Sequence, residues 1–130
     1  ALAEKIMAAV GKTVWIEEET LMDAVTAVSG SGPAYFFYIM QAIHDAAVRE
    51  GLDAETARLL SLETALGAAR LAVESTEEPG SLQQQVTSPG GTTEAAIKVL
   101  EDSGVKGTLR QAVSAARARG GELAKLLDQG

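Results

Sequence analysis

Helix-forming segments separated by short breaks at glycine and proline constrain the fold of this chain more than any other feature. Pro33 opens one such segment, which runs to Gly51 as its C-terminal stop. Asp53 then stands at the capping position of a long segment, and Pro79 begins a shorter one that ends at Val86. This pattern predicts a mostly α protein built as a helical bundle.

Composition supports the same fold class. Hydrophobic residues make up 46% of the 130 residues, but aromatic residues make up only 4%. Alanine, leucine and glycine carry most of the apolar share, which favours closely packed helices over a β-sandwich. The length is enough for one domain with a core of its own.

Two of the expected helices predict self-association. The helix over residues 33–51 is apolar nearly all round, which would place it centrally. The next helix carries a strip of small residues that would let another helix approach closely, namely Ala65, Gly67, Ala68 and Ala69. One small bundle cannot cover both surfaces, so we expect the chain not to be a monomer.

The amino-terminal residues have a different pattern. Apolar residues at helical spacing lead up to Gly11, and residues 14–16 are typical of a short strand. A helix and a strand without visible partners predict that residues 1–18 are the remnant of another domain. Residues 19–130 are then the helical domain.

Two further local features concern helix ends. Thr20 is a candidate N-cap for a short helix that runs through Val28 to a Ser-Gly-Ser-Gly-Pro break. Gly120 and Gly121 interrupt the last helix, where glycine is unfavourable, and they predict a kink or local fraying there.

Charge and composition exclude several kinds of partner. Eleven basic and eighteen acidic residues give a net charge of -7, which repels nucleic-acid backbones and anionic membrane surfaces, so we expect neither partner. The chain has no cysteine and no signal-peptide or membrane-spanning run, which favours a cytoplasmic location.

No metal site is expected. His44 is the sole histidine, and the sequence around it offers no further ligands at a useful spacing. The acidic run at residues 17–19 is interpreted as a solvated strand end, because no spaced pattern of oxygen ligands accompanies it.

One loop is a candidate binding site. In Ser-Pro-Gly-Gly-Thr-Thr, residues 88–93, a helix starts near Thr92 and leaves its first backbone N–H groups unpaired at the positive end of the helix dipole. Glycines permit close approach of a ligand, and hydroxyls add neutral donors. The loop holds no lysine or arginine, which suits a small carboxylate better than a polyphosphate. A capping turn with Thr92 as N-cap and no ligand remains the alternative.

Two stretches resemble a known family. PGSLQQQVTSPGGTTEAAIKVLE, residues 79–101, resembles the signature of pyrroline-5-carboxylate reductase, and LMDAVTAVSGSGPAYFF, residues 21–37, resembles the start of that family's dimerisation domain. The resemblance continues to the last helix. It implies the carboxyl-terminal half of such an enzyme, without the amino-terminal nucleotide-binding half, in a homodimer with intertwined helices or in a higher homo-oligomer.

The resemblance also implies an activity. The family reduces 1-pyrroline-5-carboxylate to proline by hydride transfer from NADPH or NADH, a cofactor held mainly by the missing half, so the isolated chain is expected to be inactive. Thr93 would be the catalytic hydroxyl, hydrogen-bonded to the ring nitrogen. Ser31, Gly32 and Pro33 would face the nicotinamide. The substrate-binding set would be Val86, Thr87, Ser88, Gly90, Gly91, Thr92 and Thr93. Within it the N–H groups around Gly90, Gly91 and Thr92, with Ser88, would hold the substrate carboxylate.

Two alternatives stay open. One is a noncatalytic helical oligomerisation module, which the same apolar and small-residue helices would serve. The other is the helical substrate domain of a different NAD(P)-dependent dehydrogenase, with the same architecture and another ligand.

Overall fold

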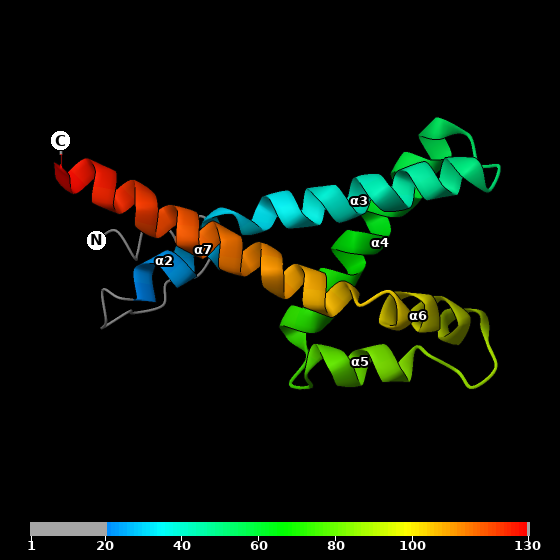
Figure 1. Ribbon diagram of the computed structural model, residues 1–130. Coiled ribbons are helices and arrows are strands. Elements are labelled where there is room, and N and C mark those ends of the chain that lie inside the picture. The colour runs from blue at the N-terminus through cyan, green and yellow to red at the C-terminus, as the bar shows by residue number, and fades with distance from the viewer. Residues whose placement is uncertain (1–20, 130) are drawn as a thin grey trace. The chain divides into compact units, whose positions relative to one another are not determined.

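A computed structural model describes residues 21–129, and helices account for most of them. The elements in chain order are α2 (Met22–Val25), the π-helix η2 (Thr26–Gly30), α3 (Gly32–Arg49), α4 (Ala54–Glu74), α5 (Pro79–Gln85), α6 (Thr92–Asp102) and α7 (Val105–Gln129) (Figure 1). No strand occurs in this range, and the mostly α class is confirmed. The helix and strand predicted within residues 1–18, and the predicted cap at Thr20, lie outside the described residues.

The chain divides into two compact units. One unit contains α2, η2, the first turn of α3 and α7, and the other contains the rest of α3 together with α4, α5 and α6. These boundaries fall after Phe36 and after Gly104, within the helical region. The domain limit predicted near residue 18 therefore stays a prediction.

Several helix ends follow the local rules that the sequence indicated. The carboxylate of Asp53 accepts a hydrogen bond from the backbone N–H of Thr56 at 2.8 Å, which caps α4 and lowers the pKa of Asp53. Gly51 follows α3 with φ 107° and Gly104 follows α6 with φ 70°, both in the left-handed region. Glycine is favoured there because it has no Cβ.

The segment before α3 differs from the single helix predicted through Val28. After the four residues of α2 the backbone widens into a π-helix, in which Ser31 N–H donates to the carbonyl of Thr26 at 2.9 Å. The hydroxyl of Tyr35 donates to the carbonyl of Ala27 at 2.7 Å, which ties the start of α3 back to η2. π-Helical turns often occur at functional sites, and this one leads directly into the Ser-Gly-Pro turn.

The local fraying predicted at Gly120 and Gly121 is wrong, since α7 continues as a helix through both residues, and the alternative kink stays a prediction. These glycines instead make room for α2, which packs against α7. A Cβ at Gly120 would lie 3.4 Å from one carboxylate oxygen of Asp23, and a Cβ at Gly121 would lie 3.5 Å from the other. Glycine is unfavourable within a helix, but at these two positions it allows α2 to approach α7 closely.

Replacement of Gly120 by leucine tests this contact. Gly120→Leu should lower the free energy of unfolding by about 1–3 kcal/mol, because the larger side chain overpacks the contact with Asp23. Gly107→Ala in the same helix is the control: its Cβ meets only the end of the Arg110 side chain, at 3.8 Å. That change should stabilise by less than about 1 kcal/mol. Urea unfolding at fixed protein concentration measures both, and equal effects would contradict the assigned role of Gly120.

A single copy of the chain has little core of its own. Among the described residues the buried hydrophobic side chains are those of Ala27 and Ala57, and no large side chain is fully buried. Phe36, Phe37 and Tyr38 on α3 are 64%, 66% and 79% exposed, so α3 is not central within one copy as its composition predicted. Apolar exposure on this scale marks an interaction surface. No described helix is both long and apolar enough to cross a bilayer.

A charge on this surface should weaken self-association. Phe36→Asp should move the sedimentation profile toward monomer at micromolar concentration, because an apolar contact would be replaced by a desolvated carboxylate. Gln84→Asp, at an exposed polar position of α5, should leave the profile unchanged. A wild-type protein that sediments as a well-behaved monomer would contradict the prediction of self-association.

Candidate functional site

Where the chain passes from α5 into the candidate loop, carbonyl groups of the last turn of α5 already accept hydrogen bonds. Val86 is the C-cap, and the next residue donates twice to the helix. The Thr87 hydroxyl donates to the carbonyl of Gln83 at 2.5 Å, and the Thr87 N–H donates to the carbonyl of Gln84 at 3.1 Å. The direction in which the chain enters the loop is therefore fixed by backbone and side-chain hydrogen bonds.

A tight turn follows, and it depends on both glycines. Gly90 has φ 73°, in the left-handed region. Gly91 N–H donates to the carbonyl of Ser88 at 3.0 Å, and a Cβ on Gly91 would lie only 3.2 Å from that carbonyl oxygen. Figure 1 shows this turn as the connection between α5 and α6.

The helix after the turn starts at Thr92, as predicted, but its N-cap is Gly91 rather than Thr92. No side chain caps this end, and the first backbone bond closes from Ala95 N–H to the carbonyl of Gly91 at 3.3 Å. The N–H groups of Thr92 and Thr93 therefore have no acceptor within the helix. The capping turn weighed as an alternative does not form through the Thr92 side chain, because glycine takes the cap position.

Two of the predicted backbone donors are already engaged. Gly91 N–H is used in the turn, and Gly90 N–H donates to a carboxylate oxygen of Glu94 at 3.1 Å. The hydroxyls of Ser88, Thr92 and Thr93 make no hydrogen bond within residues 21–129, and Thr93 is half-buried. The available donors are thus the first N–H groups of α6 and three neutral hydroxyls.

Sequence reasoning missed Glu94. Its signal was available, because a glutamate three residues after an N-cap often reaches back to the backbone that precedes the helix. With the N-cap placed at Thr92, Glu94 is only two residues after the cap, whereas it is three residues after the actual N-cap, Gly91. The error of one residue in the cap hid a charged group that hydrogen-bonds to the loop.

The residues predicted to face the nicotinamide lie at the junction of η2 and α3, in the other unit. Ser31 takes part in the turn through its carbonyl, which accepts from Ala34 N–H at 3.0 Å. Gly32 is buried and Pro33 is exposed in the first turn of α3. The exposed proline gives the turn an apolar surface, but the assigned role stays a prediction.

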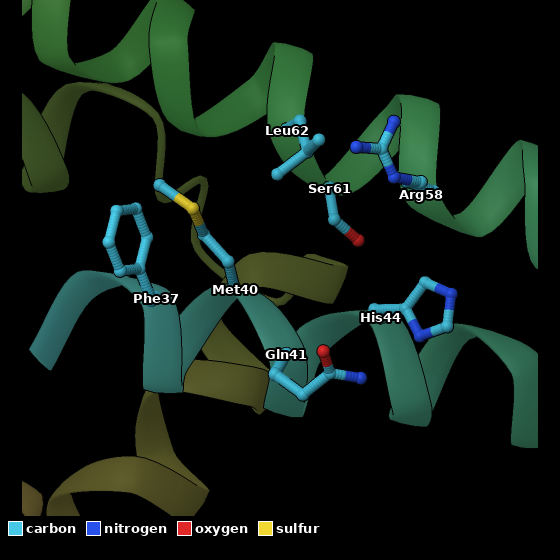
Figure 2. A pocket seen from close by; sticks show the side chains of 7 residues that line it. All are labelled: Phe37, Met40, Gln41, His44, Arg58, Ser61 and Leu62. Carbon is cyan, nitrogen blue, oxygen red and sulfur yellow. The ribbon is translucent and has the colours of Figure 1, made fainter. Parts of the chain in front are cut away.

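A cavity of about 280 Å³ lies between α3 and α4 and holds none of the predicted site residues (Figure 2). His44 projects into it from α3, while its Nδ1 lies 3.2 Å from a carboxylate oxygen of Asp45. That contact, followed by the hydrogen bond from Gln41, lowers the pKa of Asp45. The residues that line the cavity are Phe37, Met40, Gln41, His44, Arg58, Ser61 and Leu62.

No group of three histidine, aspartate or glutamate side chains in the described part of the chain is arranged to hold a metal ion. Residues 86–93 combine backbone donors at a helix start with neighbouring hydroxyls and no basic side chain, an arrangement that could accept a small anion.

Comparisons with known proteins point to one family. The model of the family described as pyrroline-5-carboxylate reductase dimerisation matches residues 19–123. The pyrroline-5-carboxylate reductase of Pseudomonas aeruginosa is 53% identical over 127 residues, which are 98% of this chain and 46% of the relative. That of Pisum sativum is 43% identical over 94% of this chain and 44% of the relative.

Solved structures agree with these matches. A pyrroline-5-carboxylate reductase from Coxiella burnetii has a TM-score of 0.86 and 51% identity over 94% of this chain and 45% of its own. Pyrroline carboxylate reductase from Plasmodium falciparum, solved with NADP bound, has a TM-score of 0.76 and 35% identity over 78% and 40%. The chain thus spans a little under half the length of these proteins.

An alanine at position 90 tests the turn itself. Gly90→Ala should lower the free energy of unfolding by about 1–2 kcal/mol, because an L residue is strained at φ 73° even though its Cβ would meet no atom. Gly80→Ala in α5 is the control, since its Cβ is also unobstructed and its backbone is not left-handed. Thermal unfolding of the two variants should separate them, and identical melting temperatures would show that the left-handed turn is not required.

Proposed function

The chain belongs to the pyrroline-5-carboxylate reductase family, and on this premise we propose that the protein that carries it reduces 1-pyrroline-5-carboxylate to proline with NADPH or NADH, the last step of proline biosynthesis. The observation that carries the proposal is the loop at residues 88–93. Its left-handed glycine presents the open start of α6, with no lysine or arginine in the segment. These donors suit a singly charged carboxylate, which is the charge of the substrate.

The carboxylate is assigned to the N–H groups of Thr92 and Thr93 with the Ser88 hydroxyl. The resemblance implied the N–H groups around Gly90, Gly91 and Thr92 with Ser88, but Glu94 and Ser88 accept the hydrogen bonds of the two glycines. The two glycines contribute instead by shaping the turn and leaving its surface open. Gly90 and Gly91 therefore belong to the binding set because they fix the backbone conformation of the loop, and not because they contact the ligand carboxylate.

Thr93 is assigned to the ring nitrogen of the substrate. Thr93 is half-buried, and its hydroxyl makes no hydrogen bond to the described residues, so it is available to a ligand. A hydroxyl both accepts and donates, which suits a nitrogen that changes from an imine to an amine during reduction. Val86, with an exposed side chain, and Thr87, whose hydroxyl is committed to Gln83, would form the apolar wall beside the ring.

The cofactor supplies the hydride that the C=N carbon receives. Ser31, Gly32 and Pro33 are assigned to its nicotinamide end, where a buried glycine permits close approach and the proline ring offers an apolar surface. The rest of the dinucleotide is proposed to bind outside this chain, in a part of the full-length enzyme that corresponds to the portion of the relatives that the chain does not span. A relative solved with NADP bound supports the choice of cofactor class.

A second copy of this chain is the proposed macromolecular partner. The uncovered face of α3 and the small-residue strip of α4, where a Cβ at Gly67 would meet no atom, both need another helix surface. The family description names dimerisation, which supports a homodimer or a higher homo-oligomer. The net charge of -7 argues against nucleic acid and anionic membranes, and a cytoplasmic location stays a prediction.

Two variants of the full-length enzyme test the roles assigned to Thr93 and Ser88. Thr93→Ala should lose about 1.5–3 kcal/mol of transition-state stabilisation, because one hydrogen bond to the reacting ring nitrogen is removed. Ser88→Ala should mainly raise the KM, since the carboxylate carries the same charge in the ground and transition states. Steady-state kinetics measure both effects.

His44→Ala is the control, because His44 lines the separate cavity between α3 and α4. It should change neither kinetic constant appreciably once helix content and assembly are confirmed. A fully active Thr93→Ala enzyme, or a folded but inactive His44→Ala enzyme, would overturn the site. A wild-type protein that neither reduces the substrate nor binds proline would favour the noncatalytic oligomerisation module.

A further inference from the structure

An acidic side chain forms a hydrogen bond with the candidate loop. A carboxylate oxygen of Glu94 lies 3.1 Å from the backbone nitrogen of Gly90 and accepts its hydrogen bond. Glu94 stands in the first turn of α6, three residues after the N-cap Gly91. This position lets the side chain fold back over the start of its own helix.

The nearest lysine on α6 does not compete for the Glu94 carboxylate. Lys98, one turn further along α6, is the cation that an i,i+4 ion pair would use. Its ammonium group instead pairs with Asp102 at 2.5 Å. No basic side chain pairs with Glu94 within residues 21–129, so its favourable interactions there are the Gly90 N–H and the positive end of the α6 dipole.

The substrate carboxylate would use the second of these features, the positive end of the α6 dipole, through the neighbouring N–H groups of Thr92 and Thr93. We propose that the Glu94 carboxylate, which accepts a hydrogen bond from Gly90 N–H, weakens the binding of every carboxylate ligand to the loop by like-charge repulsion. The proposal rests on the proposed function of the loop and adds a residue that sets its affinity. On this account Glu94 sets affinity and is not a catalytic residue, because it contacts the loop and not the reacting atoms.

The kinetic consequence follows from where the charge acts. The ligand carboxylate has the same charge before and during hydride transfer, so repulsion from Glu94 raises the KM and leaves kcat nearly unchanged. The repulsion acts near solvent, since Glu94 and Gly90 are both exposed. Its effect must therefore diminish as added salt shortens the screening length.

Two substitutions in the full-length enzyme separate charge from geometry. Glu94→Gln keeps an oxygen that can accept from Gly90 N–H and removes the charge, whereas Glu94→Ala removes both. Each variant should lower the KM for pyrroline-5-carboxylate and the inhibition constant of proline by about three- to tenfold at low salt, with kcat within about twofold of wild type. The difference from wild type should shrink at about 1 M salt.

Glu55→Gln is the matched control. It makes the same change of net charge in the first turn of α4, so it should leave KM and the proline inhibition constant unchanged. A Glu94→Gln enzyme with an unchanged or raised KM, or a decrease in KM that does not respond to salt, overturns the proposal. So does a Glu94→Ala enzyme that binds proline more weakly, because Glu94 would then support the loop. Failure of the proposed function is a separate result, because it appears in the wild-type enzyme as absence of turnover.

Discussion

The rest of this structure depends on how little apolar surface one copy of the chain can bury. Helices as long as α3, α4 and α7 expose side chains such as Phe37 and Leu71, while burial is confined to small residues such as Ala27 and Ala57. At roughly 25 cal/mol per Å² of apolar surface, an uncovered phenylalanine forgoes stabilisation that a folded domain needs. Association with another helical surface is therefore part of the folding problem and not an addition to it.

This constraint explains which parts of the fold the sequence could predict. Helix limits set by local chemistry were predicted well: Pro33 and Pro79 lie at helix starts, Asp53 caps α4, and Gly51 adopts a left-handed conformation after α3. Features that depend on neighbours in space were not. The π-helix before α3 is held by Tyr35, and the continuity of α7 at Gly120 reflects packing against Asp23. Neither contact has a sequence signature at that spacing.

The candidate site shows the same division. Turn chemistry was enough to place a helix start at Thr92 and to single out residues 88–93 as a candidate anion loop. They were not enough to assign each donor, because a one-residue shift of the cap decides whether Gly90 and Gly91 keep free N–H groups. In the structure Gly91 N–H donates to Ser88 and Gly90 N–H donates to Glu94, while the N–H groups of Thr92 and Thr93 have no acceptor within the helix. The roles of these residues in substrate and cofactor binding remain predictions.

The most direct test of the account is a crystal structure of the full-length enzyme with proline bound. The account predicts carboxylate oxygens about 2.7–3.2 Å from the backbone nitrogens of Thr92 and Thr93, with the Thr93 hydroxyl directed at the ring nitrogen. It also predicts that the cavity between α3 and α4 holds no proline. A proline carboxylate bound instead by Arg58 and His44 in that cavity would contradict the central claim, because the loop would then have no part in holding the substrate.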